Sequence, residues 1–308
     1  MTAPGPDEAV SRVLAALGID QAHLSSLGSG LASDAWRVDR PEGWFALRIA
    51  RERPGAGSTY EMEHALMGRL AGRGARVPRP VQGSWQIEDW PGPPYSLTTG
   101  LDGAPLSVAD HPRAAPALAA FLRLLHAQAI GGFGALGVRD GRLHGQQSSM
   151  AAGLLDWARR PLWPLGEARL DIHSALADRD TLRARLEVHA PTVRRALGRG
   201  PGVPLHSDLH EENILDAGGS LGIIDFGEAL IGPAAWEFAS LGYFMEWPFA
   251  DATLEAYAAD VAELTRLRKD ANAIGLCFGV YRWAQDHELG IDEDAYDEAF
   301  LLETLSRI

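Results

Sequence analysis

The sequence contains a single cysteine, Cys277, and a single lysine, Lys269, among its 308 residues. With one cysteine the chain cannot form an internal disulfide, which excludes a disulfide-stapled domain and is typical of a reducing compartment. Of the 28 basic residues, 27 are therefore arginine. Any function that needs a cationic side chain must use an arginine or that one lysine.

The sequence also lacks an uninterrupted apolar run of the roughly 20 residues that cross a bilayer, and its N-terminus shows no basic segment followed by an apolar one. Positive charge is in deficit, because 41 acidic residues outnumber 28 basic ones and give a net charge of −13. A negative chain is repelled by nucleic acid and by anionic membranes. We therefore expect a cytoplasmic protein that binds neither, and the oligomeric state stays open.

Hydrophobic residues make up 46% of the chain, which is enough for a buried core and excludes a disordered or fibrous protein. In the first hundred residues, strand-like runs alternate with helical patterns and turn residues. The expected elements are a helix at 7–17, strands at 34–39 and 44–50, a helix that begins with a capping box of Ser58 and Glu61 and stops at Gly72, and strands at 81–85 and 95–101.

Helical periodicity dominates the rest of the chain. Helical patterns are expected up to residue 126 and over 151–197, 253–267, 271–285 and 294–308. A strand-and-loop island at 204–226, with a turn at Gly218-Gly219, interrupts them. The patterns therefore predict an α+β protein with a small sheet region, residues 1–100, followed by a mainly helical region, residues 101–308.

The most informative stretch covers residues 206–227. Asp208 is followed five residues later by Asn213, and Asp225 begins the sequence Asp225-Phe226-Gly227 after a predicted strand, turn and strand. Phosphoryl transfer from a nucleotide needs a carboxylate that takes up or orients the proton of the attacking hydroxyl, and oxygen ligands that hold Mg²⁺ on the phosphates. Asp208 can supply the first, and Asn213 with Asp225 the second. A simpler interpretation, in which all three only stabilise turns and loops, stays open.

These motifs resemble those of the protein-kinase-like superfamily, and within it the small-molecule kinases of the aminoglycoside phosphotransferase and choline kinase type. His206, Asp208 and Asn213 match the family's His-x-Asp-x-x-x-x-Asn motif, and Asp225 matches its metal-binding aspartate. The resemblance implies a bilobal protein-kinase-like α+β fold. Its small antiparallel-sheet N-lobe with a helix, residues 1–100, would bind the nucleotide, and its larger helical C-lobe, residues 101–308, would carry the catalytic loop, the metal site and the acceptor-binding helices.

The resemblance also implies residue roles: Asp208 as the catalytic base, Asn213 and Asp225 as ligands of Mg²⁺, and ATP or GTP as the phosphate donor. His206 and His210 lie in the same stretch and could suggest a zinc site. With one cysteine in the chain and no carboxylates at a supporting spacing, we interpret both histidines as local packing and loop hydrogen bonding instead.

A kinase-type N-lobe covers the nucleotide phosphates with a loop of small residues, because side chains there would block the approach of backbone N–H groups. Gly28, Ser29, Gly30 and Ser33 fit this loop, although they also fit an ordinary tight turn. The next strand should present a cation to the phosphates. Since Lys269 lies in the wrong half of the chain, the cation must be Arg48, unless Arg48 is a plain exposed strand residue.

A glutamate from the following helix should pair with this cation, and both Glu61 and Glu63 are available. We prefer Glu63, because Glu61 occupies the capping-box position and its carboxylate is used by the helix end. The family pattern, a glutamate with a leucine seven residues later and a proline after the helix, is met by Glu63, Leu70 and Pro78.

The sequence departs from protein kinases in ways that favour a small-molecule acceptor. Ser207 stands where protein kinases carry an arginine, and no Ala-Pro-Glu follows Asp225. Instead Gly232 and Pro233 lead to Glu237, similar to the small-molecule family. We therefore predict an ATP-dependent O-phosphotransferase, such as an antibiotic-resistance kinase. The alternatives are an atypical Ser/Thr protein kinase and a non-catalytic nucleotide-binding module.

The acceptor is not named by any motif. Trp236, Trp247 and Trp283 lie near acidic residues in the second half of the chain, and aromatic faces with carboxylates suit a cationic or hydroxyl-rich acceptor. Each tryptophan taken singly is better explained as core, and each acid as helix surface. Only the overall acidity therefore supports an aminoglycoside, an amino alcohol or a sugar as the acceptor.

Overall fold

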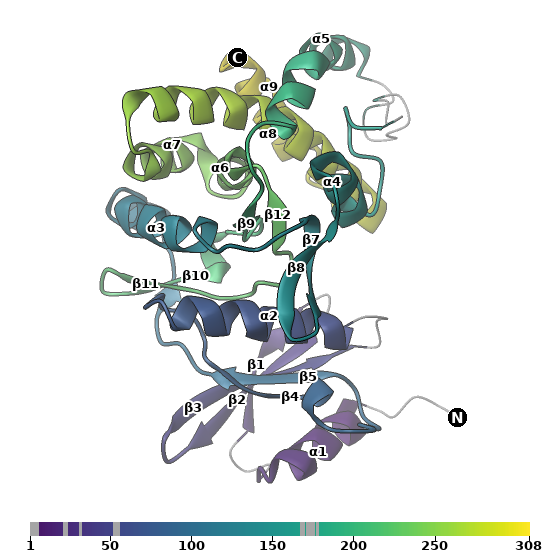
Figure 1. Cartoon of the computed structure of the whole chain (residues 1–308), viewed down its shortest axis with the longest axis vertical. Coiled ribbons are helices and arrows are strands. Elements are labelled where there is room, and N and C mark those ends of the chain that lie inside the picture. Colours follow the sequence, from purple (N-terminus) through teal and green to yellow (C-terminus); the bar gives the residue numbers. More distant parts are fainter. Residues whose placement is uncertain are drawn as a thin grey trace. The chain divides into compact units, whose positions relative to one another are not determined.

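The structure is a computed structural model that describes residues 6–20, 24–30, 33–51, 56–166, 170, 176 and 179–308. The chain divides into two compact units (Figure 1). The first, here called the sheet unit, contains Met1–Gly103 with the short segments Gly137–Leu143 and Gly222–Gly227. The second, the helical unit, contains the rest of the chain. The boundary predicted from the sequence, at residue 100, placed these two short segments in the helical region instead.

The sheet unit is built on five antiparallel strands in the order β1-β2-β3-β5-β4. Its elements are α1 (Pro6–Leu17), β1 (Leu24–Ser29), β2 (Ser33–Arg40), β3 (Gly43–Ala50), α2 (Ala56–Ala71), β4 (Pro80–Gly83), a 3₁₀ turn (Ser84–Gln86) and β5 (Tyr95–Thr99). The strand expected at 81–85 therefore ends at Gly83, and its last residues form the 3₁₀ turn. The capping-box side chain of Ser58 lies outside the described residues.

The two faces of this sheet have different partners because side chains alternate along a strand. On one face Phe45, Leu47 and Ile49 of β3 form a buried cluster with Val13 and Leu14 of α1. Residues in between, such as Arg48, point to the opposite face, where α2 lies (Figure 1). The period-two pattern of β3 thus buries an apolar core on one side and presents a cation on the other.

The helical unit contains most of two small sheets, with strand orders β11-β10-β6 and β8-β7-β12-β9, in which parts of β7, β8 and β11 belong to the short segments of the sheet unit. Its strands and 3₁₀ turns are β6 (Ala104–Pro105), η3 (Val108–Asp110), β7 (Phe133–Arg139), β8 (Arg142–Gln147), β9 (Val203–Leu205), η6 (Glu211–Asn213), β10 (Ile214–Ala217), β11 (Ser220–Ile223) and β12 (Leu230–Gly232). Its helices are α3 (His111–His126), α4 (Met150–Ala158), α5 (Asp180–Leu197), α6 (Ala234–Phe244), α7 (Glu246–Tyr257), α8 (Val261–Leu289) and α9 (Asp294–Ser306). Packing of α6 against α7 and α8, and of α8 against α5 and α9, forms the helical core.

Three sequence predictions for this unit were wrong. The hairpin of β7 and β8 was missed, and the helical stretch predicted over 151–197 is interrupted, because α4 ends at Ala158 and Arg159 adopts a left-handed conformation. The helices predicted at 253–267 and 271–285 are also misplaced. The break falls at Asp260, which caps the start of the 29-residue helix α8 by accepting a hydrogen bond from the Glu263 N–H.

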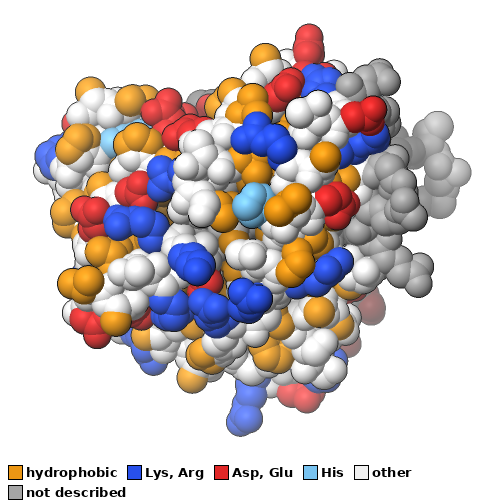
Figure 2. Space-filling model, turned by 90° about the horizontal axis from the view of Figure 1, so that it is seen from above, with side chains coloured by type: hydrophobic (Ala, Val, Ile, Leu, Met, Phe, Trp, Pro, Cys, Tyr) orange, Lys and Arg blue, Asp and Glu red, His pale blue; other side chains and the backbone are white. Residues whose placement is uncertain are grey.

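Charged residues within α8 form tertiary ion pairs. Asp270 accepts two hydrogen bonds from Arg199, just after α5, at 2.8 and 3.1 Å, and Arg268 pairs with Asp251 and Glu255 of α7. On the face that Figure 2 shows, several Lys and Arg side chains lie close together near the middle, and acidic side chains are scattered around them. In the described part of the chain, no helix is long and apolar enough to cross a membrane.

Candidate functional site

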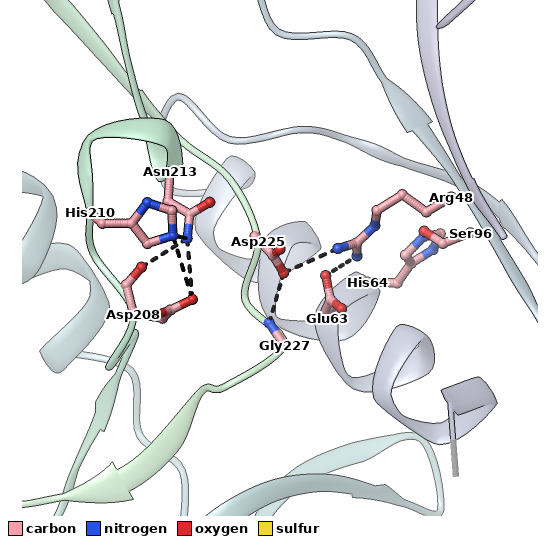
Figure 3. Close-up of polar contacts among 9 residues, drawn as sticks. All are labelled: Arg48, Glu63, His64, Ser96, Asp208, His210, Asn213, Asp225 and Gly227. Atoms are coloured by element: carbon pink, nitrogen blue, oxygen red, sulfur yellow. Dashed lines mark hydrogen bonds and ion pairs between the residues drawn. The ribbon is translucent and has the colours of Figure 1, made fainter. Parts of the chain in front are cut away.

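Arg48 is the centre of the first group of predicted site residues (Figure 3). It lies on β3, directly opposite Ala35 of β2 and Ser96 of β5. Its guanidinium forms an ion pair with Glu63 of α2 and a second one, at 3.1 Å, with Asp225. Of the two glutamates that the sequence left open, Glu63 is therefore the one that contacts Arg48. The structure brings these three predicted site residues together within the sheet unit.

The Arg48–Glu63 pair is largely withdrawn from solvent, since the Glu63 side chain is only 2% exposed and that of Arg48 is 21% exposed. Burial lowers the pKa of Arg48, but the negative charges of Glu63 and Asp225 outweigh it, and the net pKa is raised above its usual value. The guanidinium is therefore permanently charged. A buried carboxylate of this kind depends on its cation, because an uncompensated charge in the interior is costly.

His64, next to Glu63 on α2, adds no positive charge near the Arg48–Glu63 pair. Its Nε2 lies 2.8 Å from the Ser96 hydroxyl, and its ring packs edge-on against Trp85 at 4.7 Å. Burial, and then the charge of Arg48, lower the pKa of His64 to about 4. The imidazole is therefore neutral at neutral pH and does not compete with Arg48 for Glu63.

The glycine-rich turn between β1 and β2 is held by its own hydrogen bonds. The Gly30 N–H donates to the Ser33 carbonyl at 2.9 Å, and the Ser29 hydroxyl donates to Asp34 at 2.6 Å. Gly28 has φ of +132°, a conformation that side chains other than hydrogen rarely allow. Arg51, and then Ser29, lower the pKa of Asp34, which stays ionised as the anchor of the turn. Residues 31 and 32 of this turn lie outside the described part of the chain.

Asp225 combines exposure with an unusual backbone. Its side chain is 50% exposed, and its φ of +58° lies in the left-handed region, where aspartate is tolerated better than most residues. The Gly227 N–H lies 3.4 Å from Asp225 Oδ1. A side chain at Gly227 would place its Cβ 3.3 Å from the same oxygen, so the Asp-Phe-Gly sequence keeps space beside this carboxylate.

Asp208 and Asn213 form the second group, within the helical unit (Figure 3). Asn213 Nδ2 donates to the Asp208 carbonyl at 2.8 Å and lies 3.4 Å from Asp208 Oδ2. His210 Nε2 lies 2.9 Å from the same amide nitrogen and 3.8 Å from Asp208 Oδ2. The Asp208 N–H lies 3.4 Å from His206 Nδ1. Both histidines therefore make loop hydrogen bonds, as the sequence predicted.

A buried carboxylate on α6 holds the backbone of this loop. Glu237 is fully buried and accepts hydrogen bonds from the N–H groups of His206, at 2.6 Å, and Ser207, at 3.0 Å. Ser207 has φ of +68°, and its hydroxyl accepts from the Trp236 indole at 2.9 Å. A backbone in a sparsely populated conformation persists only where its surroundings over-determine it. Glu237 and Trp236 supply those constraints, and Asp208, the predicted base, directly follows Ser207.

Sequence reasoning missed His126, whose side chain lies close to the Glu237 carboxylate. His126 Nε2 is 3.8 Å from Glu237 Oε2, and its Nδ1 is 2.9 Å from the Tyr257 hydroxyl. Burial, and then the negative charge of Glu263, raise the pKa of Tyr257 to about 12. In the sequence His126 is only the last residue of an amphipathic helix, and no local signal distinguishes it.

The side-chain oxygen of Asn213, in the helical unit, and that of Asp225, in the sheet unit, are each of the kind that a hard cation such as Mg²⁺ prefers. Asp225 offers an exposed carboxylate. Because the Asn213 amide nitrogen faces Asp208 and His210, its oxygen points to the other side (Figure 3). Among the described residues, no group of three or more His, Cys, Asp or Glu side chains is arranged to hold a metal ion.

The three tryptophans considered for the acceptor are core residues. Trp236, Trp247 and Trp283 are at most 2% exposed. Phe244 also lies near the loop of Asp208, and its ring is 5.8 Å from that of His210. Tyr296 is 42% exposed and packs 5.3 Å from Tyr243, the neighbour of Phe244.

Carboxylates surround Tyr296. Burial raises the pKa of Tyr296 to about 12, and the carboxylates that add to this shift are Glu246, Asp297, Glu211 and Glu293. Arg282 is also present, with its guanidinium carbon 5.2 Å from the Phe244 ring, and it pairs with Asp286 at 3.4 Å. Around Phe244 and Tyr296, the helical unit thus presents aromatic faces and an excess of acidic side chains.

A hollow of about 470 Å³ lies elsewhere in the sheet unit, at the end of α1. It is lined by Gly18, Ile19, Asp20, Asp39, Arg40 and Pro41. None of these is a predicted site residue, and we assign the hollow no role.

An antiparallel-sheet unit that carries an arginine–glutamate pair, followed by a helical unit with an Asp-x-x-x-x-Asn loop, defines the class: the kinase-like fold of the aminoglycoside phosphotransferases. The model of the phosphotransferase enzyme family matches residues 23–284, and the chain belongs to that family. The protein is therefore a phosphotransferase enzyme. No curated protein matches the chain.

Similar solved structures show the same fold at low sequence identity. The aminoglycoside phosphotransferase APH(4)-Ia, in a ternary complex with AMP-PNP and hygromycin B, is 17% identical with a TM-score of 0.69, over 96% of this chain and 97% of that one. The GDP complex of aminoglycoside 2'-phosphotransferase-IIIa is 18% identical with a TM-score of 0.68, over 98% and 99% of the two chains. ADP-bound APH(2'')-Ib is 17% identical with a TM-score of 0.59, over 98% of both chains.

Proposed function

We propose that this protein transfers the γ-phosphate of ATP or GTP to a hydroxyl group of a small cationic or polyhydroxylated acceptor, such as an aminoglycoside, an amino alcohol or a sugar. The observation that carries the proposal is the loop of Asp208 and Asn213, which is clamped by the buried Glu237. A carboxylate held beside an amide by so many constraints has the arrangement that a kinase base requires.

In the proposed reaction, Asp208 takes the proton of the acceptor hydroxyl as its oxygen bonds to the γ-phosphorus. The bond from the γ-phosphorus to the β,γ-bridging oxygen breaks, and the nucleoside diphosphate leaves with that electron pair. Arg48, held by Glu63, binds phosphate oxygens, and the turn of Gly28, Ser29, Gly30 and Ser33 covers them. Mg²⁺, on Asn213 and Asp225, would neutralise phosphate charge when bound.

The choice of nucleotide is supported by the similar structures, which contain AMP-PNP, ADP or GDP in different proteins. ATP and GTP both fit the proposal, because the contacts that the site residues would make are to phosphates. Arg48 and the backbone of the turn bind any nucleoside triphosphate equally well at that end.

The acceptor class is supported by the surroundings of Tyr296 and Phe244. The exposed ring of Tyr296 and the half-buried ring of Phe244, with several carboxylates nearby, attract cationic groups through charge and cation–π contact. The complexes with hygromycin B and with gentamicin belong to other proteins of 16–17% identity, and they make aminoglycosides the first acceptors to test. An aminoglycoside acceptor would make the protein a cytoplasmic antibiotic-resistance enzyme.

The test is a nucleotide-consumption screen of the full chain over aminoglycosides, amino alcohols and sugars, followed by the same assay on Asp208→Asn. Because general-base catalysis contributes about 10²–10⁴-fold, we expect turnover to fall by that factor while ADP binding, measured by calorimetry, stays within about twofold, since the base does not hold the nucleotide. Asp216→Asn, an acid on β10 that pairs with Arg113, is the matched control and should keep full turnover. Unchanged turnover in Asp208→Asn would contradict the proposal.

A further inference from the structure

Tyr60 of α2 contacts two parts of the proposed phosphate-binding site at once. The guanidinium carbon of Arg48 lies 5.0 Å from the centre of the Tyr60 ring, within the range of a cation–π interaction. The Tyr60 hydroxyl forms a hydrogen bond with the side chain of Ser33, where the glycine-rich turn enters β2. The ring itself is buried, with 5% of the residue exposed.

The positions of these residues follow from the elements that carry them. Tyr60 and Glu63 are three residues apart on α2 and therefore share one face of the helix. Ser33 lies two residues before Ala35, the residue opposite Arg48 in the β2–β3 register, so Ser33 and Arg48 are on the same face of the sheet. One helix face thus reaches both the cation and the base of the turn.

We propose that Tyr60 is a positioning residue that couples the glycine-rich turn to Arg48, so that nucleotide affinity depends separately on its ring and on its hydroxyl group. This inference rests on the proposed function, and it adds a residue that no sequence motif indicated. The ring lies against the guanidinium while Glu63 pairs with it. The hydroxyl fixes the distance between that cation and the backbone of the turn.

The contact of Arg48 with Asp225 shows why an uncharged side chain, the Tyr60 ring, is useful for positioning the Arg48 guanidinium. Arg48 lies 3.1 Å from Asp225, and in the proposed function the same carboxylate is a ligand of Mg²⁺. A carboxylate that serves a metal has less charge to offer an arginine. The Tyr60 ring and Glu63 are the two contacts of Arg48 that do not depend on whether a metal is bound.

Tyr60 stays neutral throughout the usual pH range. Burial raises the pKa of its hydroxyl, the charge of Arg48 lowers it, and the result is a pKa of about 12. The hydroxyl therefore keeps its proton, and the ring remains a neutral face for the cation.

The experiment compares Tyr60→Phe, which removes only the hydroxyl, Tyr60→Leu, which also removes the ring, Ser33→Ala, and the double variant Tyr60→Phe/Ser33→Ala. Calorimetry gives the dissociation constant of ADP with Mg²⁺, and kinetics give KM for ATP, KM for the acceptor and kcat. Tyr95→Phe is the matched control. Tyr95 is a buried tyrosine of β5 whose hydroxyl accepts from Gln82 at 3.2 Å, on the α1-facing side of the same sheet.

We expect Tyr60→Phe and Ser33→Ala each to weaken ADP binding by about two- to tenfold, the effect of one lost hydrogen bond, and the double variant to be no worse than either single one. Tyr60→Leu should weaken it further, by about another two- to fivefold for the lost ring contact. KM for ATP should follow, while KM for the acceptor should not. Tyr95→Phe should lose stability without losing ADP affinity.

Two results overturn the inference while leaving the proposed function intact: wild-type ADP affinity in both Tyr60 variants, or additive effects in the double variant. If Tyr60→Leu does not fold, the comparison of Tyr60→Phe with Ser33→Ala still decides the matter. A wild-type protein that binds neither ADP nor ATP would overturn the proposed function, and this inference with it.

Discussion

Arg48 does what a lysine at the same place could not do. Its planar guanidinium contacts Glu63 through one nitrogen, Asp225 through the other and the Tyr60 ring through its face. A lysine ammonium is a point charge on a flexible stem and lacks both the fork and the flat face. An almost lysine-free composition is therefore compatible with phosphate binding, because arginine replaces lysine with a different set of contacts.

Replacing Arg48 should affect both stability and nucleotide use. In Arg48→Ala, Glu63 loses its cation in a buried position, and we expect the free energy of unfolding to fall by about 3–5 kcal/mol. Arg48→Lys keeps the charge and should fall by less, yet it should still raise KM for ATP. Urea denaturation and steady-state kinetics measure the two effects.

The control is Arg51→Ala. Arg51 pairs with Asp34 at 2.8 Å, but its side chain is 49% exposed, and exposed pairs contribute at most about 1 kcal/mol. An Arg48→Ala protein with wild-type stability and wild-type KM for ATP would show that the pair with Glu63 has neither role.

Single elements explain most of the differences between the expected and the observed secondary structure. The β7–β8 hairpin turns at Asp140-Gly141, and both residues have positive φ, 50° and 69°. An Asp-Gly pair between two strand-like runs is a strong hairpin signal, so this element was predictable from the sequence. The partners of the charged residues in α8 were not, because Arg199 and Asp251 of α7 are brought near them only by packing.

Helix α6 should control catalysis through its first turn. Glu237→Gln keeps the size of the side chain but turns an N–H₂ group toward one of two backbone donors, so one of those N–H groups loses its acceptor. We expect a loss of about 1–3 kcal/mol in stability and a fall of about tenfold or more in kcat, with the ADP affinity unchanged. Denaturation, kinetics and calorimetry separate the three effects.

Glu237→Asp separates the effect of the negative charge from that of the side-chain length, because aspartate keeps the carboxylate on a shorter side chain. Its kcat should lie between those of the wild type and Glu237→Gln. Glu255→Gln, a 60% exposed residue of α7, is the matched control and should change nothing measurable. A Glu237→Gln protein with wild-type kcat would mean that the loop keeps its conformation without this clamp.

The stability of the whole molecule depends on pH through buried groups in both units. Burial raises the pKa of Asp297 to about 7, from 3.8, and its Oδ1 accepts from the Tyr243 hydroxyl at 2.8 Å. Between these values the folded protein holds a proton that the unfolded chain releases. The contribution of Asp297 to the free energy of unfolding is therefore lost as pH rises from about 4 to about 7.

His64 acts with the opposite sign. Its folded pKa of about 4 lies below the ordinary 6.5, so the unfolded chain takes up a proton that the folded protein excludes. Its contribution is present above pH 6.5 and lost as pH falls toward 4. The two contributions oppose each other below 6.5, and of these two groups only Asp297 acts between 6.5 and 7.

Unfolding of Asp297→Asn and His64→Gln, followed from pH 4 to pH 8, tests both assignments. Asp297→Asn should lose the decline in stability between pH 6.5 and 7, and His64→Gln should lose part of the acid-side decline below 6.5. Parallel pH profiles for the wild type and both variants would contradict the assigned pKa shifts.

Much of the candidate site was predictable because it depends on short-range chemistry. The spacing of Asp208, Asn213 and Asp225, the glycine-rich turn and the choice of Arg48 by elimination of Lys269 all follow from neighbouring residues and composition. Their roles remain predictions, while the contacts of Arg48 with Glu63 and of Asn213 with Asp208 are observed.

The residues that hold this chemistry in place were decided by tertiary packing. His126 reaches Glu237 from a distant helix, Glu237 reaches a loop about thirty residues before it, and Tyr60 joins Ser33 to Arg48 across a helix and two strands. The three tryptophans beside acidic residues are core for the same reason. A sequence records which residues are neighbours along the chain, whereas burial, counter-charge and hydrogen-bond partners depend on which surfaces pack together.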